Sequence, residues 1–369
     1  MRSEKAVISF ELSSEQSIAR DMSGEFARNV LRPLAREADE AGVIEQRTLN
    51  DLWSLGLVQG LASGDEDSAG GSAIMSALIL EELGWGDAAF ALALAAPLGF
   101  MRAIVEQGSA AQKAELLPLF SGDEYHGAAV ALAEAGLGSG LGALSTTAEA
   151  DAGGFKLNGA KIQVPLVGHC SHLLVIARYE GKPDAFIVDL TAPGVVIEEP
   201  EGNLGLNPLQ LATVRFEDAA LGADARLGGN KGCDVRRIAD AARVGAASIL
   251  VGISKAVYDF TVPYTKDRVV HGAALAKKQS VAFRLVDMFT EVEACRWMCW
   301  RAATHLDKRH DDATRSAALA HVYTVEQAEW ITDEGVQLLG GHGFMRANPV
   351  ELWYRNARTL GLIEGVAGV

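Results

Sequence analysis

The chain has 369 residues, of which 49% are hydrophobic, with 48 acidic side chains against 33 basic ones. This length and composition predict a compact protein of several domains. The net charge of −15 argues against binding to nucleic acid or to an anionic membrane surface, because both require clustered Lys and Arg. The four cysteines lack paired spacing, which favours free thiols in a reducing compartment.

The first third of the sequence is expected to be helical. Ser13 and Gln16 form a capping-box pattern that opens a helix, and this helix is expected to end near Leu31, just ahead of Pro33. A second helix is expected from Thr48. We therefore interpret this part of the chain as an all-helical unit.

Neither a membrane span nor a leader sequence is expected. The longest stretch without charge, 88–101, is shorter than the roughly 20 residues that a spanning helix needs, and it contains Pro97. It is expected to form a buried helix. The charged N-terminus, with Arg2 and Lys5, is not followed by the apolar core of a signal peptide. The sequence thus predicts a cytoplasmic protein.

The hydrophobic period changes to two near residue 155. The segments 155–157 and 160–164 alternate on either side of Asn158-Gly159, which predicts a β-hairpin with a turn at these two residues. The other strand candidates are 173–177, 185–190 and 213–216. Together they predict a small antiparallel β domain.

Helical periodicity returns in the last third of the chain. The long helices expected there are 235–266, 279–307 and 313–339. Cys295 and Cys299 could be imagined as metal ligands, but they continue the apolar stripe of Leu285, Met288 and Val292, which indicates a core position. The fold class is therefore α+β, with a helical domain at 1–126, a β domain at 127–232 and a helix bundle at 233–369.

Two glycine clusters suggest close approach to a ligand. The run 136–142 does not open a helix within a βαβ unit, so it is not a Rossmann fingerprint, although it could still be an anion-contacting loop. Gly340, Gly341 and Gly343 follow a long helix, and three glycines exceed what a helix stop requires. His342 lies among them without a paired acid or nucleophile and stays unassigned.

Residues at four places along the chain resemble the acyl-CoA dehydrogenase family. The N-terminal landmark is Glu81-Glu82-Leu83-Gly84-Trp85; the C-terminal ones are Arg268 followed by Gln279, the loop Gln337-Leu338-Leu339-Gly340-Gly341-His342-Gly343-Phe344, and Ile363-Glu364-Gly365. The resemblance is collinear over nearly the whole chain. It implies three domains, the last a four-helix bundle, and FAD as cofactor.

The resemblance also implies the roles of individual residues. Arg268, Gln279, Gln337, Gly340 and Gly341 would contact the flavin dinucleotide, partly across a subunit boundary.

Glu364 matches the catalytic carboxylate of the family, which removes the α-proton of an acyl-CoA while the β-hydrogen leaves to the flavin. Arg243 and Gly365 would contact the substrate. Some relatives keep the base on an earlier helix, but that position is Ala242 here. An electron-transferring flavoprotein would accept the electrons.

The β domain departs from the family pattern on the side of the flavin ring. Ser139 is kept, but Ala133 stands where the family has threonine, Gln163 where it has tryptophan and Pro165 where it has threonine. These positions remain candidate flavin contacts. Their changes suggest an α2β2 assembly with a second dehydrogenase-like chain, as in relatives that act on bulky thioesters, although a homotetramer remains open.

Two other functions compete with a dehydrogenase. A non-catalytic subunit that completes a partner's FAD site is favoured by the departures in the β domain and opposed by Glu364. A flavin monooxygenase of the same fold would generally lack a base at this position.

Overall fold

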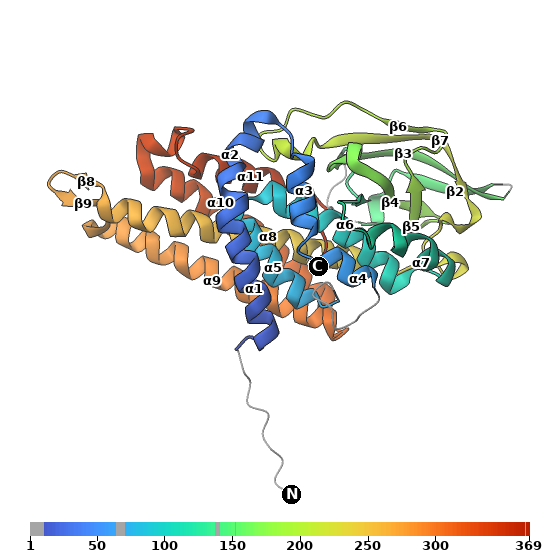
Figure 1. The fold of residues 1–369 in the computed structure, drawn as a ribbon, viewed down its shortest axis with the longest axis horizontal. Helices are drawn as coiled ribbons and strands as arrows, with labels where there is room; N and C mark the ends of the chain where they lie inside the picture. The colour runs from blue at the N-terminus through green and yellow to red at the C-terminus, as the bar shows by residue number, and fades with distance from the viewer. Residues whose placement is uncertain (1–10, 64–70, 137–140, 152, 366) are drawn as a thin grey trace, which may run out of the picture.

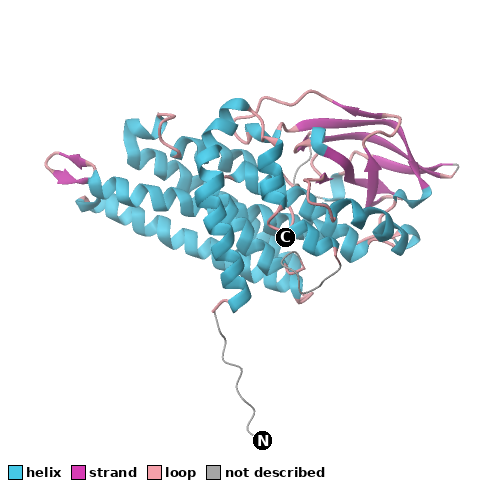
Figure 2. Ribbon diagram, viewed as in Figure 1, coloured by secondary structure: helices cyan, strands magenta, loops and turns pink. Residues whose placement is uncertain are grey.

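The computed structural model describes residues 11–63, 71–136, 141–151, 153–365 and 367–369. Helices occupy both ends of the sequence and a β-sheet lies between them (Figure 1). Figure 2 shows the sheet gathered at one end of the molecule, against a larger helical body. The expected order of helical, β and helical parts is confirmed.

The N-terminal helices surround one apolar helix, α6. The elements are α1 (Ser14–Phe26), a π-helical turn (Ala27–Leu31), α2 (Arg32–Ala41), α3 (Gln46–Trp53), α4 (Leu57–Ala62), α5 (Ala73–Gly86), α6 (Ala88–Gln107), α7 (Ala110–Leu116) and a 3₁₀ turn (Leu117–Phe120). The Ser13 capping box is present, with Gln16 as its partner.

The predicted break near Leu31 is wrong, because the chain stays helical through the π turn and Pro33 falls in the first turn of α2. The wider π turn lies just before Pro33, where a proline lacks the N–H that an α-helix would use. Helix α3 begins at Gln46, slightly before the expected Thr48.

The middle of the chain forms a seven-stranded sheet in the order β1-β4-β2-β3-β7-β6, with β5 paired to β4. The strands are β1 (Gly127–Ala131), β2 (Thr147–Asp151), β3 (Gly154–Val164), β4 (Cys170–Tyr179), β5 (Lys182–Asp189), β6 (Val195–Ile197) and β7 (Ala212–Gly222). The β4–β5 hairpin and the β7 strand agree with the sequence-based expectation.

Two expectations about the sheet are wrong. The sheet is mixed, because β1 runs parallel to β4. Asn158-Gly159 makes no turn; β3 continues through both residues, and its register against β7 shifts there. Gly159 has φ +137 and its α-carbon lies close to Thr146, where a Cβ would come within 2.7 Å, so the glycine serves a bulge and close packing.

The C-terminal helices form the long side of the molecule. They are α8 (Val235–Asp267), α9 (Gln279–Asp307), α10 (Ala313–Leu339) and α11 (Val350–Leu360), with a small ribbon of β8 (Val269–Val270) and β9 (Ala273–Ala274) between α8 and α9. Cys295 and Cys299 are buried, which confirms the core stripe on α9.

Among the described residues, α6 and α8 are long and apolar enough to cross a membrane. Most of each helix is buried inside the protein, 94% and 78% of the respective apolar windows, as is common for core helices.

Candidate active site

Glu364 lies on the segment that follows α11. Backbone bonds from Gly361 to Ala357 and from Ile363 to Leu360 close the end of the helix, and the buried Ile363 anchors the turn. Glu364 is half-buried and Gly365 is buried with φ +84. A Cβ on Gly365 would lie 2.4 Å from Leu132 Cβ. Both the positive φ and this close approach require glycine at the position. The residue after Glu364 therefore packs directly on the chain that leaves β1.

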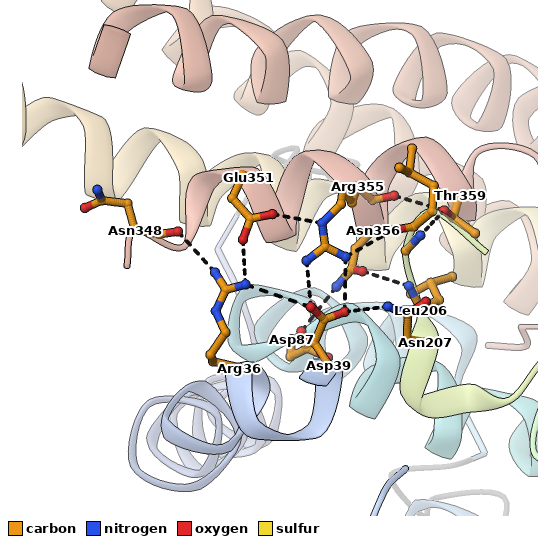
Figure 3. A network of polar contacts seen from close by, with 12 residues as sticks. Arg36, Asp39, Asp87, Leu206, Asn207, Asn348, Glu351, Arg355, Asn356 and Thr359 are labelled. Carbon is orange, nitrogen blue, oxygen red and sulfur yellow. Dashed lines mark hydrogen bonds and ion pairs between the residues drawn. The ribbon is translucent and has the colours of Figure 1, made fainter. Parts of the chain in front are cut away.

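A polar network holds α11 in place (Figure 3). Arg355 makes a bidentate pair with the buried Asp39 of α2, at 2.6 and 3.1 Å, and its Nε donates to Glu351 at 2.8 Å. Arg36 adds an ion pair to Glu351, at 2.5 Å. Charge-assisted bidentate pairs fix orientation as well as separation.

The same network ties α11 to the β domain. Asn356 accepts a bond from Leu206 N at 2.9 Å, and Thr359 Oγ1 accepts one from Gly205 N at 3.0 Å. Asn356 also donates to Asp87, which caps α6. The start of the Glu364 segment is thus fixed relative to both neighbouring domains.

The loop after β1 is built on a buried ion pair. Glu134 accepts bonds from Lys161 Nζ at 2.6 Å, Ser145 N at 2.6 Å and Thr146 N at 3.1 Å. Burial raises the pKa of Glu134, but these hydrogen bonds and the Lys161 charge outweigh it and hold the pKa at about 2. Burial lowers the pKa of Lys161 to about 8, an effect that Glu134 partly offsets.

The candidate flavin-ring residues lie beside this pair. Ala133 O accepts a bond from Ile162 N at 3.0 Å, which sets the loop against β3. Gln163 has φ +56 at a register shift of β3, a conformation that costs energy for a residue with a side chain. Pro165 is buried and offers no N–H. Ser139 lies outside the described residues.

A second cluster of candidates lines a hollow of about 450 Å³ at the end of α8 and α10. Arg268, Gln337, Gly340 and Gly341 form part of its wall, and the first two side chains are exposed. Open space surrounds the α-carbons of both glycines, so their backbone is accessible to a ligand. An exposed guanidinium, an amide and accessible glycine backbone fit the phosphates of a dinucleotide.

His342 also lines this hollow, and Gln279 lies close in the sequence to two residues of its wall. Gln279 is exposed at the start of α9, between the wall residues Leu275 and Val281. His342, which the sequence left unassigned, lies with Nδ1 2.7 Å from the Tyr264 hydroxyl, and this contact supports the glycine loop. No group of three or more metal-ligating side chains that could hold an ion occurs among the described residues.

The two clusters do not meet within one chain. Residues 367–369, just beyond Glu364, pack on Gly245, and Arg268 follows the end of the same helix α8. At 1.5 Å per residue, about 35 Å of helix separates Gly245 from Arg268. Figure 1 shows the β8–β9 ribbon next to Arg268 at the opposite end of the molecule from the sheet.

Comparisons with known proteins agree with this architecture. Three models of the acyl-CoA dehydrogenase family match successive parts of the chain: the N-terminal domain at 13–123, the middle domain at 129–219 and the C-terminal domain at 234–369. The short-chain specific acyl-CoA dehydrogenase of Bos taurus is 30% identical over 98% of this chain and 89% of its own. The chain belongs to the acyl-CoA dehydrogenase family.

Two other members of the family are similar over most of their length. The structure of butyryl-CoA dehydrogenase from Megasphaera elsdenii has a TM-score of 0.86 at 29% identity, covering 96% of this chain and 95% of that one. Subunit CarC of the caffeyl-CoA reductase–Etf complex of Acetobacterium woodii is 28% identical over 97% of this chain and 96% of its own.

Within this acyl-CoA dehydrogenase fold, Arg243 does not join Gly365. It pairs with Asp240 at 3.2 Å. Burial lowers the pKa of His321 on α10, and the charge of Arg243 lowers it further. Arg243 lies about 200° around α8 from both Ala241 and Gly245, at 100° per residue, so it faces away from residues 367–369. Its contact with substrate remains a prediction.

Sequence reasoning missed two parts of the site. One is the Glu134–Lys161 pair, although both residues occur in the family motifs that the β domain otherwise changes. The other is the burial of residues 367–369, whose only signal is their apolar and glycine composition.

Proposed function

We propose that this chain catalyses the α,β-desaturation of an acyl-CoA thioester in a flavin-dependent assembly, with Glu364 as the base. The observation that carries the proposal is the position of Glu364, half-buried and held by the tight contact of Gly365 with Leu132. Gly365, which follows Glu364 in a helical domain, thereby packs on Leu132, which follows strand β1 of the sheet.

The chain's own residues act on the α-carbon. The Glu364 carboxylate takes the α-proton, and the backbone N–H of Glu364 helps to hold the thioester oxygen as negative charge develops on it. FAD, when bound, accepts the β-hydrogen as hydride. The φ of +84 at Gly365 and the α11 network keep Glu364 at a fixed place, which favours a productive approach.

Arg268, Gln279, Gln337, Gly340 and Gly341 would hold the dinucleotide part of FAD. Because about 35 Å of α8 separates this hollow from the Glu364 segment, we propose that it serves the FAD of a neighbouring subunit. Each active site would then be completed by two chains.

An exposed apolar face supports such an assembly. It lies on α9 and α10 and consists of Phe283, Val286, Phe289, Trp297, Leu319 and Val322. Large apolar side chains exposed in this number on two neighbouring helices favour association with another chain. A tetramer that buries this face agrees with a shared active site.

We further propose that the partner is a different dehydrogenase-like chain, in an α2β2 tetramer. At the flavin-ring side, Ala133 offers no hydroxyl and Pro165 no N–H, whereas the side that would reach a neighbour's cofactor keeps most of its polar residues, namely Arg268, Gln279 and Gln337. A non-catalytic role is the second candidate, favoured by Ala133 and Pro165. A homotetramer is the other possible assembly.

The electron acceptor that we propose is an electron-transferring flavoprotein, since a relative similar over nearly its whole length is a subunit of an Etf complex. A cytoplasmic location agrees with the four free cysteines.

A Glu364→Gln variant tests the assignment of the base. The flavin-loaded variant should lose about 10³-fold or more in turnover, and it should no longer exchange the α-hydrogens of an acyl-CoA with deuterated water. Glu199→Gln is the matched control, because Glu199 is an exposed glutamate away from the site. Unchanged α-exchange in Glu364→Gln would favour the non-catalytic subunit.

A further inference from the structure

Residues 367–369 are inserted between two core helices. Ala367 is 1% exposed and Val369 is fully buried, although both follow a half-buried glutamate. Figure 1 places this end of the chain in the middle of the molecule, near α6 and α8. A segment of three residues is thus part of the core.

Three glycines make the insertion possible. A Cβ on Gly368 would lie 2.1 Å from Gly99 Cα of α6, and a Cβ on Gly245 of α8 would lie 3.0 Å from Gly368 N. A Cβ on Gly99 would in turn lie 3.1 Å from Ala367 O. At Gly368, the space between α6 and α8 is too narrow for any side chain, so only glycine fits there.

The slot between α6 and α8 that the segment fills is almost full. Beside Gly368, only about 10 Å³ remains free, between small and apolar residues such as Gly99, Val130 and Ala241 and a polar side that includes Glu106 and Arg237. This is no more than the space for one water molecule, so no further methylene group can enter while the segment is in place.

The slot begins close to the proposed base. At most 3.6 Å per residue, Gly368 lies within about 14 Å of Glu364 along the chain. A substrate whose α-carbon is at Glu364 and whose acyl chain runs between α6 and α8 would meet residues 367–369.

We propose that residues 367–369 form the inner end of the acyl-binding site. They restrict this enzyme to acyl groups that end before Gly368, where the segment passes between Gly99 of α6 and Gly245 of α8. The inference rests on the function proposed above, with Glu364 as the base. An acyl group that reaches farther enters only when the segment leaves the slot. The segment is therefore a determinant of specificity for chain length.

Two variants test the proposal in the flavin-loaded assembly, with a partner chain if flavin binding requires one. One lacks residues 367–369; the other is Gly368→Val, whose side chain cannot pass Gly99. Flavin bleaching is measured under anaerobic conditions with butyryl-, octanoyl- and palmitoyl-CoA. Gly202→Val is the matched control, because a Cβ at Gly202 meets nothing within 4 Å.

The kcat/KM ratio for octanoyl- over butyryl-CoA should rise on the order of tenfold or more in both variants, because each methylene newly buried strengthens binding several-fold. The control should keep the wild-type ratio. If butyryl-CoA is oxidised and the ratio is unchanged in the folded variants, the inference fails and the proposed function stands. If no acyl-CoA bleaches the flavin of the wild type or of any variant, both fail.

If the shortened protein does not fold, Gly368→Val decides alone. Hydrogen exchange of the segment in the wild type gives an independent answer: bound octanoyl-CoA should speed exchange at residues 367–369, and butyryl-CoA should not. Equal exchange with both thioesters would overturn the proposal.

Discussion

Lys161 Nζ lies 2.6 Å from Glu134 Oε1, and neither side chain is more than 2% exposed. Lys161 also donates to Leu132 O at 3.1 Å, and the Leu132 side chain packs on Gly365. The pair therefore connects the loop proposed to face the flavin with the segment that carries Glu364.

Breaking the pair should destabilise the protein. Lys161→Met leaves the Glu134 carboxylate buried without its cation, which is expected to cost about 3–5 kcal/mol in the free energy of unfolding. Denaturant melts measure this cost. Lys156→Met is the control, since the Lys156 pair with Asp151 is on the surface and should contribute about 1 kcal/mol or less. Equal effects of the two substitutions would contradict the structural role of Lys161.

The Glu134 carboxylate predicts a pH dependence. Its pKa is about 2 in the folded protein against 4.5 as the ordinary value. Between these values the unfolded chain binds more protons, so this contribution to stability is lost as the pH falls from about 5 to 2. It amounts to on the order of 3 kcal/mol. A Glu134→Gln, Lys161→Met double variant should show a correspondingly flatter acid limb in melts across this range; an identical acid limb would refute the assignment.

The Asp39–Arg355 pair should be sensitive to a conservative change. Arg355→Lys keeps the charge but loses the bidentate geometry and the bond from Nε to Glu351. We expect a loss of about 2 kcal/mol or more in unfolding free energy and lower turnover, because α11 positions Glu364. Arg346→Lys, at an exposed site, should change neither. Full stability and turnover in Arg355→Lys would show that the network does not position the base.

Substitutions in the two clusters should have different effects: one in the hollow should lower flavin binding, and one at Glu364 should lower catalysis. Arg268→Ala should lower the flavin bound by the assembly, because it removes a phosphate contact from the hollow, whereas Glu364→Gln should keep the flavin and lose turnover. Flavin absorbance per chain and acyl-CoA bleaching measure the two effects. Arg236→Ala, an exposed arginine at the start of α8, is the control. Equal flavin content in Arg268→Ala and the wild type would remove the hollow from the cofactor site.

Periodicity predicted helices near 279–307 and 313–339, and both are present with these bounds, because the apolar pattern is long and the charged break at 308–312 separates the two. Predictions from local sequence patterns failed where contacts with residues distant in the sequence determine the structure. Asn158-Gly159 has the composition of a turn, yet its glycine is needed for packing on Thr146.

The sequence likewise predicted some parts of the candidate site and not others. Motif register indicated Glu364 and the glycine loop, and the structure places them in two separate clusters that the sequence could not order in space. The insertion of residues 367–369 depends on Gly99 and Gly245, which lie more than a hundred residues away in the chain, and no local pattern joins them.

The most direct test of the account is the visible spectrum of the protein, purified alone and together with a candidate partner chain of the same family, before and after anaerobic addition of butyryl-CoA. The account predicts flavin absorbance in the assembly and its bleaching by the thioester, and the loss of bleaching with Glu364→Gln. Flavin that stays oxidised in every preparation, or bleaching that is unchanged in Glu364→Gln, would contradict it.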